Sequence, residues 1–308
     1  MIYNNVLDAM GKTPLIRLNH LTDESCAEIL VKFEAVNIGG SVKTRTALQM
    51  IEAAEKRGEL NKNSIIVEPT SGNQGIGLAL VCAVKGYKSC LIMPDSVSEE
   101  RSKLVKQYGS DVALVHDDGD IGKAIEECIA LANKMKNENP NVFVPQQFEN
   151  SDNLFAHKYH TALEIVQDTE GPIHGFCSGI GTGGTISGIG QTLRKLYEDI
   201  EIWAVEPEHA AILSGGGIGT HLQMGIGDGL IPEILDQSIY DNICIVSDED
   251  AISTAKALAC REGLLCGVSS GTNVAAAIKL AKKLGPGKTV VTLLPDTAER
   301  YFSTPLFD

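Results

Sequence analysis

The sequence predicts an α/β protein made of two three-layer αβα domains with mainly parallel sheets. Short apolar runs bounded by turn residues alternate with amphipathic segments of helical periodicity, which is the pattern of βαβ units. This series occurs twice along the chain. With 308 residues and 43% hydrophobic content, the chain is long enough to bury two modest cores.

The first series lies in the N-terminal half. Strands are predicted at residues 64–68, 89–94, 112–115 and 142–145, and helices at residues 43–57, 75–85, 99–108 and 121–136. Several of these helices begin just after a turn rich in Ser, Asp or Gly, which favours a helix start. Together these elements make one compact α/β unit.

The second series follows without a Pro-rich or Ser-rich linker. Strands are predicted at residues 173–177, 201–205, 243–246 and 289–294, and helices at residues 185–197, 248–262 and 272–284. Two α/β domains that face each other place a ligand cleft at the carboxyl ends of their strands.

The charge and the cysteines exclude several classes of function. A net charge of −14 opposes binding to nucleic acid and to anionic membranes, which both attract clustered Lys and Arg. No apolar leader and no stretch near the roughly 20 apolar residues of a membrane span is found, so a cytoplasmic enzyme is expected. The eight cysteines form no CxxC and no paired Cys/His spacing, which predicts reduced core residues and no metal site.

A glycine-rich loop at residues 179–185 lies between an apolar strand and a helix, where bare backbone amides and the helix dipole bind an anion. The loop also satisfies G-x-G-x-x-G, and Glu206 follows Gly184 by 22 residues, as the ribose-binding acid of a nicotinamide dehydrogenase does. The loop occurs late in the chain and carries an extra glycine and two threonines. These features favour binding of a phosphate monoester. Alone, the loop leaves a phosphate cofactor, a dinucleotide and a structural turn open.

Two further segments carry candidate chemistry. Lys43 begins a predicted helix, where the dipole and partial burial favour a reactive amine, although a surface lysine is the alternative. Residues 68–75 offer hydroxyls, amides and backbone N–H groups at a strand-to-helix turn, which suits a carboxylate. A well-capped helix is the alternative for this segment.

Taken together, the lysine and the two loops resemble the cysteine synthase and cystathionine β-synthase family of fold-type II pyridoxal-phosphate enzymes. The resemblance covers nearly the whole chain. It runs through Gly11-Lys-Thr-Pro-Leu, Ser41-Val-Lys, Thr70-Ser-Gly-Asn, Pro145-Gln-Gln-Phe-Glu-Asn, Gly181-Thr-Gly-Gly-Thr, Ser269-Ser-Gly and Glu299-Arg-Tyr. It implies the tryptophan synthase β-like architecture, with a smaller domain at 35–145 holding the substrate carboxylate loop, and a larger domain at 1–34 and 146–308 holding the phosphate loop.

The resemblance also implies a role for each matching residue. Lys43 would hold pyridoxal 5'-phosphate as a Schiff base and take the α-proton, and Ser269 would face the pyridine nitrogen. Other cofactor-binding residues would be Asn73, Gly181, Thr182, Gly183, Gly184 and Thr185. Substrate-binding residues would be Thr70, Ser71, Gly72, Gln74, Gln147 and Gly225. A neutral serine at the ring nitrogen limits carbanion delocalisation, which favours loss of a β-substituent over transamination.

The activity implied is β-replacement on a serine-like or cysteine-like amino acid through an aminoacrylate intermediate. The first hypothesis is cysteine synthase, which makes L-cysteine and acetate from O-acetyl-L-serine and sulfide. The alternative consumes cysteine or serine, releases hydrogen sulfide or water, and forms serine, lanthionine or cystathionine. A nicotinamide oxidoreductase would leave Lys43 and the carboxylate loop unexplained.

Departures from the family pattern bear on both hypotheses and leave both open. Asp228 stands where sulfhydrylases tend to carry alanine, and it is a candidate catalytic residue that binds the substrate or acts as general base, with a solvated loop acid or helix cap as the alternative. Gln74 stands where members carry threonine, so substrate orientation is expected to differ. A homodimer is implied by the family, whereas binding to serine acetyltransferase has no support in this sequence.

Overall fold

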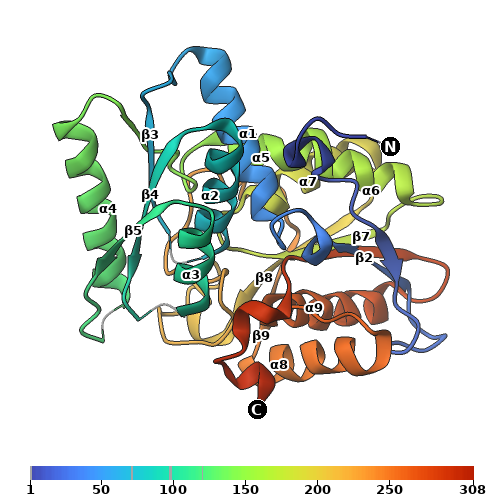
Figure 1. The fold of residues 1–308 in the computed structure, drawn as a ribbon. Helices are drawn as coiled ribbons and strands as arrows, with labels where there is room; N and C mark the ends of the chain where they lie inside the picture. The colour runs from blue at the N-terminus through green and yellow to red at the C-terminus, as the bar shows by residue number, and fades with distance from the viewer. Residues whose placement is uncertain (1, 71, 97–98, 120) are drawn as a thin grey trace. The chain divides into compact units, whose positions relative to one another are not determined.

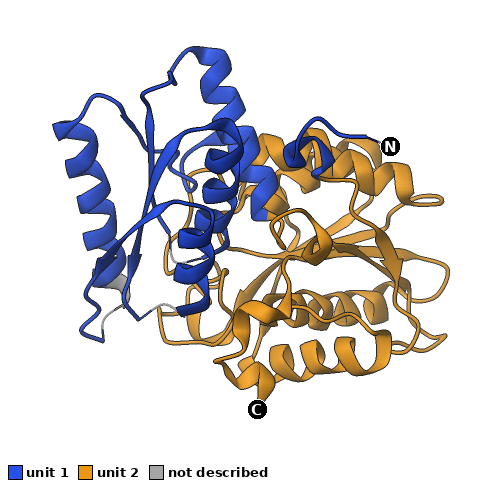
Figure 2. Cartoon of the chain, in the orientation of Figure 1, with its two compact units in different colours: residues 1–10, 43–153 blue, residues 11–42, 154–308 orange. Residues whose placement is uncertain are grey.

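The computed structural model describes residues 2–70, 72–96, 99–119 and 121–308, and the chain divides into two compact units (Figure 1, Figure 2). Unit 1 consists of Met1–Met10 and Lys43–Asn153, and unit 2 of Gly11–Val42 and Leu154–Asp308. Both units are therefore discontinuous in sequence. The domain boundaries predicted near residues 35 and 145 stay a prediction.

Unit 1 contains a four-stranded, fully parallel sheet of order β5-β4-β3-β6. Its strands are β3 (Ile65–Pro69), β4 (Lys88–Pro94), β5 (Asp111–Val115) and β6 (Val142–Phe143), and its helices are α1 (Lys43–Arg57), α2 (Asn73–Lys85), α3 (Glu99–Gln107) and α4 (Ile121–Glu138). All eight predicted elements of the first series are present. Apolar residues of α4 cover one face of the sheet, while α2 and α3 lie on the other side (Figure 1).

Unit 2 contains a six-stranded sheet of order β1-β2-β10-β7-β8-β9, in which only the edge strand β1 is antiparallel to its neighbour. Its strands are β1 (Leu15–Arg17), β2 (Glu28–Phe33), β7 (Gly175–Gly179), β8 (Glu201–Pro207), β9 (Asn242–Val246) and β10 (Thr289–Leu294). Its main helices are α6 (Ala162–Asp168), α7 (Gly184–Leu196), α8 (Asp248–Ala257) and α9 (Val268–Leu284), and α5 (Ser151–Ala156) joins the two units in sequence.

Two hydrophobic clusters cover the two faces of the six-stranded sheet. One includes Ala251 of α8 and Val274 of α9, and the other includes Ile165 of α6 and Ile189 of α7. Every residue of β10 is buried, as expected of a parallel strand covered on both faces. The predicted αβα layering is therefore confirmed for this unit.

Two helical segments have π geometry. His157–Thr161 lies between α5 and α6, and Leu258–Glu262 continues α8 to the end of the helix predicted at residues 248–262. Such widened turns are often found at functional sites. The described part of the chain contains no helix that is both long and apolar enough to cross a membrane.

The fold determines where the candidate residues lie in each unit. Thr70 directly follows β3, and Gln147 follows β6 after a short loop. In unit 2, Gly181 follows β7 in the same way. Loops after the carboxyl ends of parallel strands are the usual place for ligand sites in α/β folds.

Candidate active site

Unit 1 carries Lys43, Thr70, Gly72, Asn73, Gln74 and Gln147, while Ser71 lies outside the described residues. Lys43 is the first residue of α1, as predicted, and is half-buried. The start of α2 packs closely against it, because a Cβ at Gly77 would lie only 2.9 Å from the Lys43 carbonyl oxygen. Glycine at 77 thus lets the first turns of α1 and α2 come together.

Thr70 and Gly72, which follow β3, are held by one backbone bond to β4 and one side-chain bond. The buried Thr70 donates its N–H to the Ile92 carbonyl at 2.8 Å, and its Oγ1 accepts from the Gly72 N–H at 3.3 Å. Gly72 is the N-cap residue of α2 and brings no side chain to the helix end. Backbone N–H groups at such a helix start suit an anionic ligand.

Gln74 ends in a buried amide that is only partly satisfied. The residue is 2% exposed, its Oε1 lies 2.7 Å from Thr46 Oγ1, and its Nε2 has no hydrogen-bond partner. Thr46 Oγ1 also lies 2.8 Å from the Lys43 carbonyl, and a hydroxyl has one proton to donate. Whichever way the amide is turned, one of its polar ends has no hydrogen-bond partner.

Gln147 is fixed on both sides of its backbone. Its N–H donates to Glu68 Oε1 at 2.9 Å, and its carbonyl accepts from Asn153 Nδ2 at 2.8 Å. Burial raises the pKa of Glu68 to about 7, although hydrogen bonds from the Gln147 and Gln146 amides oppose the rise. Glu68 was not a candidate from the sequence, because a glutamate at the end of a strand is usually solvated.

In unit 2, the loop between β7 and α7 forms a cradle that only glycine permits. A Cβ at Gly181 would lie 2.5 Å from the Gly225 carbonyl oxygen. Gly183 has a φ of 79°, and a Cβ there would lie 2.8 Å from Leu235 Cβ. The helix α7 then begins at Gly184 with no side-chain cap from Gly183, and the Gly184 N–H donates to Thr182 Oγ1 at 3.4 Å.

A buried histidine lies behind this loop. His157 is 0% exposed; its Nε2 lies 3.3 Å from Thr185 Oγ1 and its Nδ1 lies 3.1 Å from Thr161 Oγ1. The π segment places this ring against the first turn of α7, where Gly188 leaves room for it. No motif in the sequence marks His157, because its contact with Thr185 depends on helix packing.

Ser269 is buried in the first turn of α9. The N-cap residue Gly267 donates its N–H to the Asp296 carbonyl at 3.1 Å, and Asp296 Oδ2 accepts from the Tyr301 hydroxyl at 2.5 Å. This places Ser269 at a rigid helix start whose neighbours are buried and polar.

Asp228 lies beside the glycine-rich loop that contains Gly181. It is half-buried, and its Oδ2 lies 3.6 Å from the position that a Cβ at Gly181 would take. The preceding residue, Gly227, donates its N–H to the Ile180 carbonyl at 2.8 Å, and its own carbonyl lies 3.1 Å from His221 Nε2. Asp228 therefore sits beside the glycine cradle rather than at a helix start.

Glu206, the residue that would bind a ribose in the dinucleotide alternative, already accepts hydrogen bonds within the protein. Its carboxylate accepts from the Leu213 N–H at 2.6 Å and from the N–H and hydroxyl of Ser214 at 3.1 and 2.9 Å. These bonds tie the loop after β8 to the end of that strand. A ribose-binding role for Glu206 finds no support in this arrangement.

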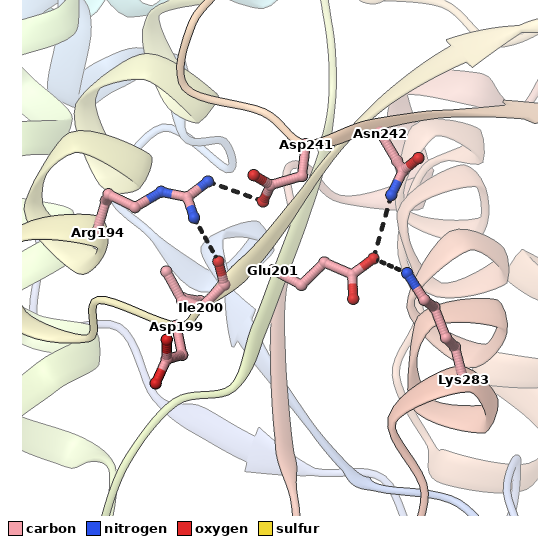
Figure 3. Close-up of a pocket in the computed structure, with 7 residues that line it drawn as sticks. All are labelled: Arg194, Asp199, Ile200, Glu201, Asp241, Asn242 and Lys283. Carbon is pink, nitrogen blue, oxygen red and sulfur yellow. Dashed lines mark hydrogen bonds and ion pairs between the residues drawn. The ribbon is translucent and has the colours of Figure 1, made fainter.

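A pocket of about 360 Å³ opens at the amino ends of β8 and β9 (Figure 3). Its lining residues are Arg194, Asp199, Ile200, Glu201, Asp241, Asn242 and Lys283. Figure 3 shows Arg194 bonded to Asp241, and Lys283 and Asn242 both directed at Glu201. Its charges are thus largely paired, and it lies at the opposite strand ends from the glycine cradle, so the pocket is not the candidate active site.

All eight cysteines are free, and six are buried. Burial raises the pKa of Cys82, Cys177 and Cys266 to about 12, which keeps these thiols protonated. The expectation of core cysteines is wrong for Cys260, which is exposed in the second π segment. Among the described residues, no cluster of His, Cys, Asp and Glu is arranged to hold a metal ion.

Comparison with known proteins gives consistent matches. Residues 6–296 match the model of the family described as pyridoxal-phosphate dependent enzymes. A cysteine synthase of Staphylococcus aureus is 47% identical over 305 residues, which cover 99% of this chain and 97% of that protein.

Solved structures agree with the sequence match. A hydrogen sulfide-producing enzyme from Fusobacterium nucleatum is 41% identical with a TM-score of 0.91, over 97% of this chain and 100% of that one. An aspartate-to-asparagine mutant of a hydrogen sulfide-producing enzyme, complexed with an α-aminoacrylate intermediate, is 37% identical with a TM-score of 0.88, over 96% of this chain and 89% of that one.

Proposed function

This chain belongs to the family of pyridoxal-phosphate-dependent enzymes, and on that premise we propose that it is a cysteine synthase. The reaction joins sulfide to the β-carbon of O-acetyl-L-serine and releases acetate, which gives L-cysteine. The observation that carries this proposal is the 47% identity to a cysteine synthase over 99% of the chain.

The residues of the phosphate loop fit the cofactor. When bound, pyridoxal phosphate supplies an aldehyde for an amine and a ring that withdraws electrons from the substrate α-carbon. The cradle at Gly181 and Gly183 has no room for side chains, and α7 begins directly after it with no side-chain cap from its N-cap residue. Thr182 and Thr185 add hydroxyls at the same turn. This donor set suits a phosphate monoester.

We assign the remaining cofactor contacts to three residues. Lys43 would hold the cofactor through its amine and would take the α-proton of the substrate. Asn73 would donate to the ring hydroxyl, and Ser269 would stand at the ring nitrogen. Ser269 is buried and neutral, so it would bring no negative charge to the ring nitrogen, which would favour early departure of the β-substituent.

The substrate carboxylate is assigned to the loop of unit 1. Thr70 and Ser71 would supply hydroxyls beside Gly72 at the start of α2, and Gln147 would supply an amide. The buried amide of Gln74, with one polar end unsatisfied, supports a further contact to the substrate. Gly225, beside the phosphate loop, allows the backbone to approach the bound substrate.

A second candidate function is β-replacement that consumes cysteine and releases hydrogen sulfide. The observation that favours it is the carboxylate of Asp228, placed beside the phosphate loop at Gly181. A carboxylate there can take a proton from water or another nucleophile that adds to the β-carbon. Serine or lanthionine would then be the product.

The two candidates are separated by one experiment on the purified protein. The absorbance of the protein is recorded first, because a lysine-bound cofactor makes the protein yellow. The protein is then given either O-acetylserine with sulfide or cysteine alone, and amino-acid products and sulfide are measured. Cysteine formed from the first mixture, with no sulfide from the second, supports the cysteine synthase. Sulfide with serine or lanthionine supports the second candidate, and a colourless protein contradicts both.

The expected homodimer and the expected cytoplasmic location are also proposals. The homodimer is implied by the family resemblance and is tested by light scattering of the purified protein. A mass near twice the 32.9 kDa of the chain supports it.

A further inference from the structure

A buried carboxylate links the two segments of unit 1 to which the substrate carboxylate is assigned. Glu68 lies in β3, two residues before Thr70, and is 1% exposed. Its Oε2 accepts from the Gln146 N–H and its Oε1 accepts from the Gln147 N–H, each at 2.9 Å. One side chain thus connects the start of the carboxylate loop with Gln147.

The backbone at Gln146 is strained. Its φ of 59° is in the left-handed region, which costs a non-glycine residue roughly 1 kcal/mol or more. The turn is closed by the Glu149 and Asn150 N–H groups, which donate to the Gln146 carbonyl at 3.0 and 2.9 Å. Strain of this kind persists only where the surroundings impose it, and here the bonds to Glu68 do so.

The strained turn determines the direction of the next side chain. Gln147 is buried, and its carbonyl is held by Asn153 Nδ2 at 2.8 Å. With its N–H held by Glu68, both backbone groups of Gln147 are fixed. Its side chain therefore leaves the backbone in one direction.

Holding the turn with the buried carboxylate of Glu68 costs free energy of folding. Its hydrogen bonds come from backbone amides, and within the described residues it forms no ion pair. The nearby Glu149 adds a like charge and, with burial, opposes ionisation of Glu68. A neutral residue would avoid this penalty, so stability alone does not account for a carboxylate here. Two N–H donors, one on each oxygen, are the arrangement that an ionised carboxylate accepts best.

We propose that Glu68 is a positioning residue that holds Gln147 in the orientation in which it binds the substrate carboxylate. This inference rests on the proposed function, which assigns Gln147 to that carboxylate. Glu68 acts only through the backbone of Gln147, because both of its oxygens are already engaged by N–H groups.

The test measures how strongly the holoenzyme prefers a carboxylate. L-Alanine, which has no leaving group on its β-carbon, and L-alaninamide, which lacks the carboxylate, are titrated while the cofactor absorbance is followed. In Glu68→Gln, the amide can accept only one of the two N–H groups and turns a donor toward the other. We expect the affinity for alanine to fall by roughly 10- to 100-fold, with the affinity for alaninamide unchanged.

Three further variants sharpen the test. In Gln147→Ala the preference for alanine also falls, and the double variant Glu68→Gln/Gln147→Ala should lose no more than Gln147→Ala alone. Asp152→Asn is the matched control, because Asp152 is another buried carboxylate of unit 1, paired with Arg57 at 2.7 Å. It should lower the unfolding temperature and keep the ratio of the two affinities.

The outcomes separate this inference from the function on which it rests. If the wild-type protein is yellow and Glu68→Gln keeps the wild-type ratio of affinities for alanine and alaninamide, only the role of Glu68 is overturned. Equal losses for alanine and alaninamide, or losses that multiply in the double variant, also overturn it. A wild-type protein that takes up no cofactor overturns both the role of Glu68 and the proposed function.

Discussion

At the scale of single residues, the buried His157 decides what the hydroxyl of Thr185 can offer a ligand. If Thr161 donates to Nδ1, the proton of the neutral ring is on Nε2, which then donates to Thr185 Oγ1. The single proton of the Thr185 hydroxyl is thereby left for an acceptor such as a phosphate oxygen. We therefore expect the histidine to orient the Thr185 hydroxyl.

Replacing His157 by phenylalanine removes this orientation and keeps an aromatic ring in the buried site. We expect the affinity of the apoprotein for pyridoxal phosphate to fall by roughly five- to tenfold, the worth of one hydrogen bond. Absorbance titration measures it. His160→Gln, in the same π segment but exposed, serves as the control and should bind like wild type. Unchanged affinity in His157→Phe would contradict this role.

Glu68 should make the stability of the protein depend on pH. Burial raises its pKa from 4.5 to about 7, so the folded state holds the proton more tightly than the unfolded state does. Its contribution to stability is therefore present at low pH and is lost as the pH rises from about 4.5 through 7.

Glu68→Gln removes this titration. Between pH 5 and pH 8, wild type should lose about 1–3 kcal/mol of unfolding free energy more than the variant does. Urea unfolding at both pH values measures this difference, in which other titrating groups largely cancel. An equal pH dependence in both proteins would show that Glu68 does not titrate in this range.

Asp228 distinguishes the two candidate reactions. If it is the base for a nucleophile adding to the β-carbon, Asp228→Asn should slow sulfide release from cysteine by roughly 100-fold or more. Uptake of the cofactor should persist, because the glycine cradle is intact. Asp236→Asn, which affects another acid of the same long loop, is the control. Equal sulfide release from Asp228→Asn and wild type would leave Asp228 without a catalytic role.

At the scale of elements, the packing of α7 against the first π segment supports the phosphate loop. A Cβ at Gly188 would lie 2.5 Å from the Leu154 carbonyl oxygen and 2.8 Å from His157 Cβ. Close approach of these helices therefore requires glycine. The position of His157 behind Thr185 depends on this contact.

Gly188→Ala should separate the two helices. We expect the unfolding free energy to fall by about 1–3 kcal/mol, as in other overpacked interiors, together with a weaker affinity for the cofactor. Thermal unfolding and cofactor titration measure the two effects. Gly217→Ala is the matched control, since a Cβ at Gly217 meets nothing within 4 Å. Wild-type stability in Gly188→Ala would show that the helices can move apart.

The sequence predicts elements whose pattern is local and fails where distant residues decide. β10 is an apolar run and could be recognised. β2 could not be recognised, because it contains Lys32. The burial of this lysine depends on its ion pair with Glu164 and on its hydrogen bond to the Thr13 carbonyl. The π segments have the same apolar spacing as an α-helix, so their geometry comes from packing. Glu68 and His157 were missed because the groups they hold lie elsewhere in the sequence.

At the scale of the whole molecule, the two units are interleaved in sequence. Unit 2 takes β1 and β2 from before residue 43 and its other strands from after residue 153. β2 lies between β1 and β10, and its Ile29 and Val31 are fully buried. The alternation of strands and helices predicts α/β architecture, but it does not predict that an early strand belongs with the last one.

This interleaving predicts how fragments behave. A fragment of residues 1–153 contains β2 without β10, which leaves an unpaired strand edge and exposed apolar residues. It should aggregate, whereas residues 43–153, which lack β2, should stay more soluble. Expression of both fragments and centrifugation of the lysates measure this. Equal solubility would mean that β2 needs no partner strand.

The pairing of β2 with β10 also has a consequence for synthesis. Glu28 and Thr289 are partners in the sheet although 261 residues separate them. At the usual pace of translation, β2 waits on the order of ten seconds or more for that partner to leave the ribosome. Its apolar face must be shielded meanwhile, which makes the nascent chain a natural client for chaperones.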